Sequence, residues 1–122
     1  MTRVNVVPVQ ELCDQHLLAE HREIKRIPNL MLSGKLKDLG DIPEEYVLGK
    51  GHMKFFLDKM YFLYVRYSDI RDECLKRRFK VQWLWPNYYP PISQDYKPTE
   101  QALKLNRQRI KERMPKTPRW TK

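Results

Sequence analysis

The chain has 122 residues, a length that favours one domain with a modest core. Lysine and arginine number 24 against 15 aspartate and glutamate residues, for a formal net charge of +9, which suits a polyanion such as nucleic acid, although a membrane surface or an acidic protein would also fit. No apolar run approaches the ~20 residues of a transmembrane span, and the first residues lack a signal-peptide pattern, so we expect a cytoplasmic protein without a membrane segment.

The first predicted element is a helix that begins near Asp14 as N-cap and runs toward Pro28, which ends or kinks it. At about 100° per residue, six side chains fall within one arc of roughly 120°, namely Gln15, His16, Ala19, Arg22, Glu23 and Arg26, so this face is largely polar. A neighbouring arc is apolar and is interrupted by Glu20, so the helix is amphipathic. On spacing alone, the polar face is explained by surface ion pairs worth only ~0–1 kcal/mol.

The second residue adds a chemical possibility to this face. Thr2 is small, so an initiator methionine before it is normally removed, and the α-amine of Thr2 then starts the chain. The reference pKa of such an amine is about 7.7–8.0, which leaves roughly a tenth of it neutral at pH 7 and ready to act as a nucleophile. An ordinary frayed terminus is the alternative interpretation.

The segment after Pro28 is predicted to form loops and short helical turns, because Gly34, Gly40 and Pro43 punctuate it. The glycines before His52 lack the GxxxxGK[ST] spacing of a phosphate-binding loop, so we predict no nucleotide site there. They are expected to permit a close approach of the backbone to DNA phosphates or to the first helix. We expect His52 to be a hydrogen-bonded structural histidine.

Aromatic and aliphatic residues recur at helical spacing from Phe55 to near Phe79 and predict a central core helix. The basic residues at its end, 76–78, suit the negative end of the helix dipole, an interpretation as good as DNA binding. Cys13 and Cys74 are expected to be buried free thiols rather than a disulfide or metal ligands. No metal ion and no cofactor is predicted anywhere in the chain.

Prolines argue against regular structure in residues 81–98 and predict an ordered loop that packs on the domain. Trp83 and Trp85 are expected to cover the core, although stacking on an extruded base is a second possibility. The last helix should run from near Thr99 to Met114 and stop before Pro115. The predicted fold is therefore all-α: a single compact domain spanning 1–122, with three principal helices and long irregular connecting loops.

Several runs, in order along nearly the whole chain, resemble the bacteriophage pyrimidine-dimer DNA glycosylase family. The runs are 2–5 (TRVN), 11–23 (ELCDQHLLAEHRE), 48–59 (LGKGHMKFFLDK), 73–79 (ECLKRRF), 95–100 (DYKPTE) and 118–120 (PRW). The sequence departs from the family in a shorter loop after the first helix, in Lys25, which replaces a proline, in the composition of 83–91, and in the absence of the tyrosine-rich segment that follows the tryptophan. These departures concern lesion preference more than reaction type.

The resemblance implies a DNA glycosylase with abasic-site lyase activity on cyclobutane pyrimidine dimers in duplex DNA. The α-amine of Thr2 would attack C1′ and form an imine, with Glu23 as the catalytic carboxylate. Five side chains of suitable type can hold phosphates, namely Arg3, Gln15, His16, Arg22 and Arg26, and Arg109 and Arg113 align with basic residues near the active site. We expect a monomer. A glycosylase for another damaged base and a non-catalytic DNA-binding protein are the alternatives.

Overall fold

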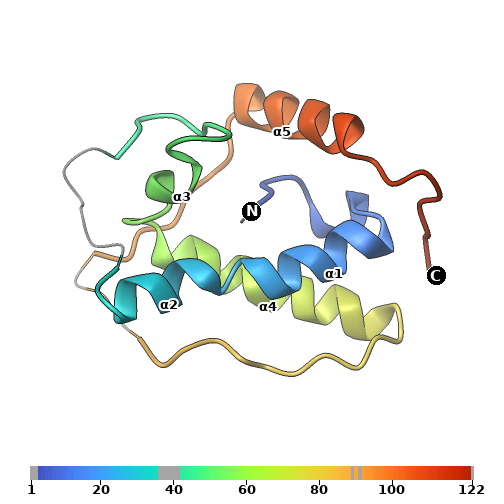
Figure 1. Cartoon of the computed structure of the whole chain (residues 1–122), viewed down its shortest axis with the longest axis horizontal. Helices are drawn as coiled ribbons and strands as arrows, with labels where there is room; N and C mark the ends of the chain where they lie inside the picture. Colours follow the sequence, from blue (N-terminus) through green and yellow to red (C-terminus); the bar gives the residue numbers. More distant parts are fainter. Residues whose placement is uncertain (1–2, 36–41, 89, 91, 122) are drawn as a thin grey trace.

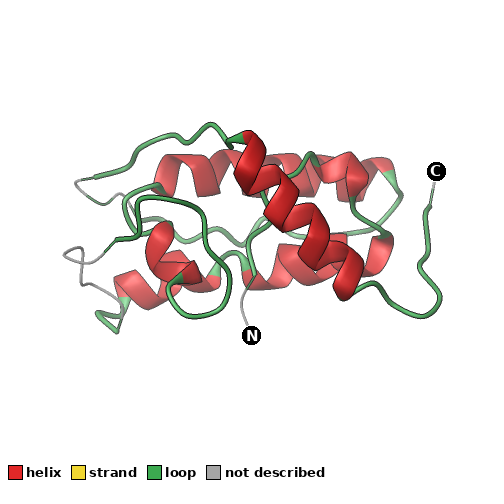
Figure 2. Ribbon diagram, turned by 90° about the horizontal axis from the view of Figure 1, so that it is seen from above, coloured by secondary structure: helices red, strands yellow, loops and turns green. Residues whose placement is uncertain are grey.

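The computed structural model describes residues 3–35, 42–88, 90 and 92–121 (Figure 1). Within these ranges the chain forms helices and no strand (Figure 2), so the prediction of an all-α fold is confirmed. The elements are the 3-10 helix η1 (Val9–Glu11) and the α-helices α1 (Asp14–Glu23), α2 (Arg26–Leu32), α3 (His52–Phe55), α4 (Met60–Lys76) and α5 (Glu100–Glu112). The three longest are α1, α4 and α5. None of the described helices is long and apolar enough to cross a membrane.

The N-terminal segment lies between helices. Figure 1 shows it passing between α5 on one side and the α1–α4 pair on the other. The amide of Val6 donates to the side chain of Asn106 on α5 at 2.7 Å, and Arg66 on α4 donates to the carbonyl oxygen of Val7. An extended segment therefore forms part of the interior, and side chains take the place of a partner strand in satisfying its backbone.

The predicted first helix is divided in two. α1 ends at Glu23 and α2 begins at Arg26, so the break comes before Pro28 and not at it. Pro28 is the third residue of α2, where a backbone N–H would have no partner within the helix, and a proline is tolerated there. The division means that Glu23 and Arg26 belong to different helices.

The predicted N-cap was wrong. Cys13 occupies the N-cap position and Asp14 is the first helical residue, with its side chain buried. The carboxylate of Asp14 accepts hydrogen bonds from the guanidinium of Arg77 at 3.1 Å and from the hydroxyl of Thr121 at 2.5 Å. Arg77, expected to complement the helix dipole or to bind DNA, is buried and donates to Glu73 at 2.9 Å. Asp14 thus ties together α1, the end of α4 and the C-terminal segment.

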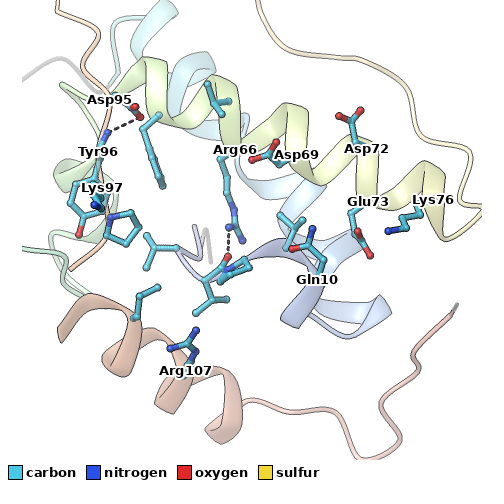
Figure 3. Close-up of a pocket in the computed structure, with 18 residues that line it drawn as sticks. Gln10, Arg66, Asp69, Asp72, Glu73, Lys76, Asp95, Tyr96, Lys97 and Arg107 are labelled. Carbon is cyan, nitrogen blue, oxygen red and sulfur yellow. Dashed lines mark hydrogen bonds between the residues drawn. The ribbon is translucent and has the colours of Figure 1, made fainter. Parts of the chain in front are cut away.

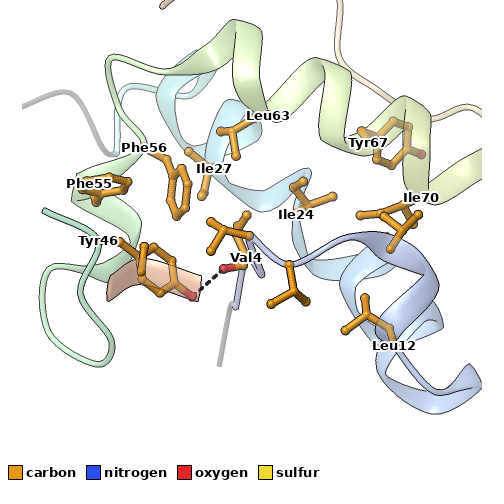
Figure 4. Packing of buried hydrophobic residues seen from close by; sticks show 14 of the residues in the cluster. Val4, Leu12, Ile24, Ile27, Tyr46, Phe55, Phe56, Leu63, Tyr67 and Ile70 are labelled. Atoms are coloured by element: carbon orange, nitrogen blue, oxygen red, sulfur yellow. Dashed lines mark hydrogen bonds between the residues drawn. The ribbon is translucent and has the colours of Figure 1, made fainter. Parts of the chain in front are cut away.

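The core gathers around the N-terminal segment (Figure 4). The aromatic series predicted as one helix is shared by α3 and α4, with a break over residues 56–59. The rings of Phe55 and Phe56 meet edge to face at 5.0 Å, an arrangement that adds to their burial energy. Cys13 and Cys74 are buried and free, as predicted. Burial raises the pKa of the Cys74 thiol to about 11.

The described part of 81–98 has no helix or strand, as predicted, and it is anchored to α4. The hydroxyl of Tyr67 donates to the carbonyl oxygen of Gln82 and accepts the amide of Leu84. Trp85 is half-buried against the core, but Trp83 is 40% exposed. Trp83 packs against the ring of buried Tyr67, with centroids 4.9 Å apart, so it covers the core from an exposed position rather than lying within it.

The last helix agrees closely with its prediction. Thr99 is the N-cap of α5, and its hydroxyl accepts the amide of Ala102 at 3.0 Å. The helix ends at Glu112, two positions before the predicted Met114.

Candidate active site

A pocket of about 280 Å³ opens between the N-terminal segment, α1 and the end of α5. It is lined by Arg3, Asn5, His16, Ala19, Glu20, Glu23, Ile110 and Arg113. Four residues predicted from the sequence, one or two from each of three elements far apart in the chain, therefore meet in one cavity, namely Arg3, His16, Glu23 and Arg113.

Glu23 lines this pocket from α1. It is the last residue of α1, and its Oε1 atom accepts the backbone N–H of Arg3 at 3.2 Å. The carboxylate is therefore directly beside the first described residue of the chain. Thr2, the predicted nucleophile, lies outside the described residues, so its role stays a prediction.

Positive charge surrounds the carboxylate. Burial lowers the pKa of Arg3, and the charges of Arg109 and Arg113 lower it further. A guanidinium remains charged at neutral pH, so three cations lie close enough to repel one another. Arg109 also forms an ion pair with Glu112 at 3.1 Å. Such a cluster is suited to an anionic ligand, because an anion relieves this repulsion.

Arg22 and Arg26 are exposed on either side of Glu23 in the sequence. Arg22 lies in the last turn of α1 and Arg26 is the first residue of α2. Within the described part of the chain, neither has an acidic partner within ion-pair distance. Among the described residues, therefore, Arg22 and Arg26 form none of the surface ion pairs that are the simpler interpretation of this helix face.

Gln15 and His16 bind the C-terminal segment. The amide of Gln15 donates to the carbonyl oxygen of Thr117 at 2.9 Å and accepts the N–H of Arg119 at 3.0 Å. His16 Nε2 lies 3.1 Å from the carbonyl oxygen of Arg113. Both residues therefore hold neighbouring parts of the protein in place, and their predicted contacts with DNA remain predictions.

Sequence reasoning missed a buried polar network behind the pocket. Glu20 accepts from Arg66 Nε at 2.8 Å and from Asn5 Nδ2 at 2.7 Å, and Asn5 Oδ1 accepts from Asn106 Nδ2 at 2.8 Å. The signal for Glu20 was its position within an otherwise apolar helix arc. Its partners lie 15 and 46 residues away in the sequence, so no local spacing could identify them.

A larger cavity, about 810 Å³, lies elsewhere, between the N-terminal segment, α4 and residues 95–98. Figure 3 shows Asp69, Asp72 and Glu73 along the α4 side of this cavity. Basic side chains line the same cavity, namely Arg66, Lys76, Lys97 and Arg107, so its lining has no single sign of charge. Arg66 lines this cavity and Glu20 lines the smaller one, so their buried ion pair separates the two.

Residues 1–87 match the sequence model of the pyrimidine dimer DNA glycosylase family. The chain belongs to this family. The resemblance predicted from the sequence motifs is confirmed, and membership in a DNA glycosylase family agrees with the nucleic-acid partner expected from the net charge. The match includes Arg3 and Glu23 and ends before α5, so the place of Arg109 and Arg113 in the site rests on geometry and charge.

Proposed function

We propose that this glycosylase excises cyclobutane pyrimidine dimers from duplex DNA through the α-amine of Thr2 and then cleaves the abasic site as a lyase. The observation that carries the proposal is the 3.2 Å hydrogen bond from the Arg3 amide to Glu23. This hydrogen bond means that a carboxylate lies beside Arg3, in a cavity that basic side chains also line. In this proposal, the enzyme acts as a monomer and uses no cofactor.

Covalent geometry links this observation to the amine. Three bonds separate the α-amine of residue 2 from the amide nitrogen of Arg3, and standard bond lengths keep the two nitrogens within about 4 Å. A carboxylate oxygen 3.2 Å from that amide nitrogen is therefore at most about 7 Å from the amine. In the proposal, rotation about the Cα–C bond of residue 2 turns the amine toward Glu23, so that a proton passes between them directly or through one water. Removal of Met1 is required, because an additional residue would carry the amine away.

In the proposed reaction, the neutral amine attacks C1′, and the bond between C1′ and the base breaks. The base leaves with the bonding electrons and takes up a proton. Glu23 stabilises the positive charge that develops at C1′ and accepts the proton released from the amine. The C1′–O4′ bond then breaks and O4′ takes up a proton, so the sugar ring opens to give an imine between C1′ and the chain terminus, as expected for an amine nucleophile.

The imine then permits strand cleavage. Its electron-withdrawing nitrogen acidifies C2′, a base removes a C2′ proton, and the C3′–O bond breaks with departure of the phosphate. Water finally hydrolyses the imine and regenerates the free amine. We assign the C2′ proton to Glu23, the acidic side chain of the pocket that is not already bound by Arg66.

DNA binding in this proposal uses the cations around the pocket. Arg3, Arg109 and Arg113 would hold phosphates at the cavity, and Arg22 and Arg26 would extend the contact along α1 and α2. Gln15 and His16 complete the set. A pyrimidine dimer stacks and pairs poorly, so the cost of extruding a nucleotide, a few kcal/mol in sound DNA, is lower at the lesion.

Borohydride trapping tests the proposal, because reduction makes an imine permanent. Incubated with dimer-containing duplex, the enzyme should give a covalent adduct that peptide mapping locates at the amine of Thr2. Acetylation of the terminus should abolish the adduct, because an amide is not a nucleophile. Retention of Met1 should also abolish it, because the amine is moved away from Glu23 and a change of about 1 Å in reacting geometry can cost a hundredfold in rate. Thr2→Ser is the control and should remain active.

An adduct on an internal lysine, formed at full rate by an enzyme with a blocked terminus, would overturn the mechanism. A panel of duplexes with other damaged bases would show whether the lesion assignment holds. No adduct with any of them would leave only the non-catalytic DNA-binding alternative.

A further inference from the structure

The main chain beside the pocket is held by two side chains that do not line it. His52 Nε2 accepts the N–H of Val4 at 2.8 Å, and the hydroxyl of Tyr46 donates to the carbonyl oxygen of Val4 at 3.0 Å (Figure 4). Val4 is fully buried and belongs to no helix. Both of its backbone polar groups are therefore fixed by side chains rather than by secondary structure.

His52 is itself held firmly. A backbone N–H can only donate, so Nε2 must be the unprotonated nitrogen, and Nδ1–H then donates to the carbonyl oxygen of Val47 at 2.8 Å. The imidazole meets the rings of Tyr46 and Phe56 edge-on, each at 5.5 Å. Gly51, with φ of 92°, precedes it in the left-handed conformation that glycine favours.

The electrostatic surroundings keep this ring neutral. Burial lowers the pKa of His52, and the positive charges of Arg3 and Arg109 lower it further, against opposing contributions from the Val47 hydrogen bond and Glu20. A neutral imidazole retains the Nε2 lone pair, which accepts the hydrogen bond from the Val4 N–H.

Only Arg3 separates Val4 from the terminal residue. The N–H of Arg3 points to Glu23 on α1, and the next N–H, that of Val4, points to His52 on α3. The peptide unit between them is planar, so fixing the Val4 N–H also fixes the Arg3 carbonyl carbon and limits the path of the chain before it.

We propose that His52 is a positioning residue of this site: by holding the Val4 amide, it directs the chain terminus so that the amine meets Glu23. Tyr46 acts with it on the Val4 carbonyl. The inference rests on the proposed function, because it concerns the placement of the proposed nucleophile.

The sharpest test changes one backbone atom. Cys13 allows a synthetic peptide of residues 2–12 to be ligated to residues 13–122, which gives the full chain with every side chain intact. An ester at residue 4 replaces the Val4 N–H by oxygen and removes the bond to His52. The matched control is an ester at residue 7, whose N–H donates to Asn106 at 3.2 Å and lies farther from the terminus.

The Val4 ester should slow borohydride trapping on abasic duplex by about a hundredfold in a single turnover, because the amine is displaced from its reacting geometry. Its affinity for a duplex with a non-reacting tetrahydrofuran site should remain that of the parent. The Val7 ester should trap at nearly the parent rate. Equal slowing by both esters would show a general structural effect, and no slowing by the Val4 ester would exclude the positioning role.

Two side-chain variants give an independent measurement. His52→Gln keeps an acceptor near the position of Nε2, whereas His52→Phe keeps the ring packing without the acceptor. The glutamine variant should trap faster, and equal rates would contradict the inference. If either variant does not fold, the ester comparison still decides. Absence of an N-terminal adduct in the unmodified enzyme would instead refute the proposed function.

Discussion

At the scale of single residues, the two carboxylates of the candidate pocket, Glu20 and Glu23, have different surroundings. Glu20 and Glu23 are one helical turn apart and line the same pocket. Glu20 is buried with its charge balanced by Arg66, whereas Glu23 contacts only a neutral amide among the described residues. A buried ion pair is a structural element that is costly to break, so Glu20 supports the site while Glu23 is available for proton transfer.

We therefore expect Glu23→Gln to lower base release by about 10²–10⁴, the usual contribution of an acid–base group. The amide can still accept the Arg3 N–H, so affinity for dimer-containing duplex should be retained. Single-turnover release and gel-shift binding measure the two quantities separately. Glu100→Gln, the same chemical change at an exposed position on α5, serves as the control, and a Glu23→Gln enzyme as fast as the parent would remove Glu23 from the mechanism.

At the scale of the elements, attachments between distant segments shape the site. The C-terminal segment is bound to the start of α1 through Asp14, and the pocket is closed on one side by the end of α5. Burial alone would raise the pKa of Asp14, but the hydrogen bonds of Thr121 and Arg77 and the charge of Arg77 outweigh it, so the pKa is lowered. The folded state therefore binds fewer protons than the unfolded state.

The sign of this shift determines a pH dependence. The stabilisation by ionised Asp14 is complete above its ordinary pKa of 3.8 and is lost as the pH falls through the lower, folded value. Asp14→Asn should cost about 1–3 kcal/mol at pH 7, with a smaller difference at pH 3, by urea unfolding. Asp72→Asn, which removes an exposed ion pair with Arg71, should change stability by less than about 1 kcal/mol. A constant Asp14→Asn difference across this range would contradict the assignment.

The same attachments explain what the sequence could and could not predict. Local spacing and residue type are enough to predict the all-α fold class, the start of α5 near Thr99 and the burial of the two cysteines. The buried partners of Glu20 and Asp14 do not, because ion pairs across 46 and 63 residues are created by packing. Arg3, Glu23 and Arg113 could be selected as site residues, but their meeting in one pocket depends on where α5 crosses the N-terminal segment.

At the scale of the whole molecule, a net charge of +9 attracts nucleic acid from a distance. The larger cavity is lined by four acidic and four basic side chains, so it has no dominant sign of charge. Beside the candidate pocket, the charges of Arg109 and Arg113 act on Arg3, and this arginine cluster would orient the molecule with its pocket toward the duplex.

If the five arginines at positions 3, 22, 26, 109 and 113 all contact phosphates, log affinity should fall with log salt at a slope of about −4.5, or roughly 500-fold between 50 and 200 mM. Arg113→Gln should reduce the slope by about 0.9. Lys104→Gln, which removes the same charge from an exposed position on α5, should leave the slope unchanged. Fluorescence anisotropy with labelled duplex measures both, and a flat response would exclude the arginine-lined surface as the DNA interface.

The burial of the N-terminal segment has a consequence for local unfolding. Chain ends usually fray first, with almost no free-energy cost. Here the amides of Val4, Val6 and Val7 donate to side chains of α3 and α5, so they are released to solvent only when these helices separate from the core. We therefore expect these three amides to exchange hydrogen slowly, at the rate set by global unfolding, although they lie in no helix or strand. From Arg3 onward, the beginning of the chain thus shares the cooperative stability of the fold.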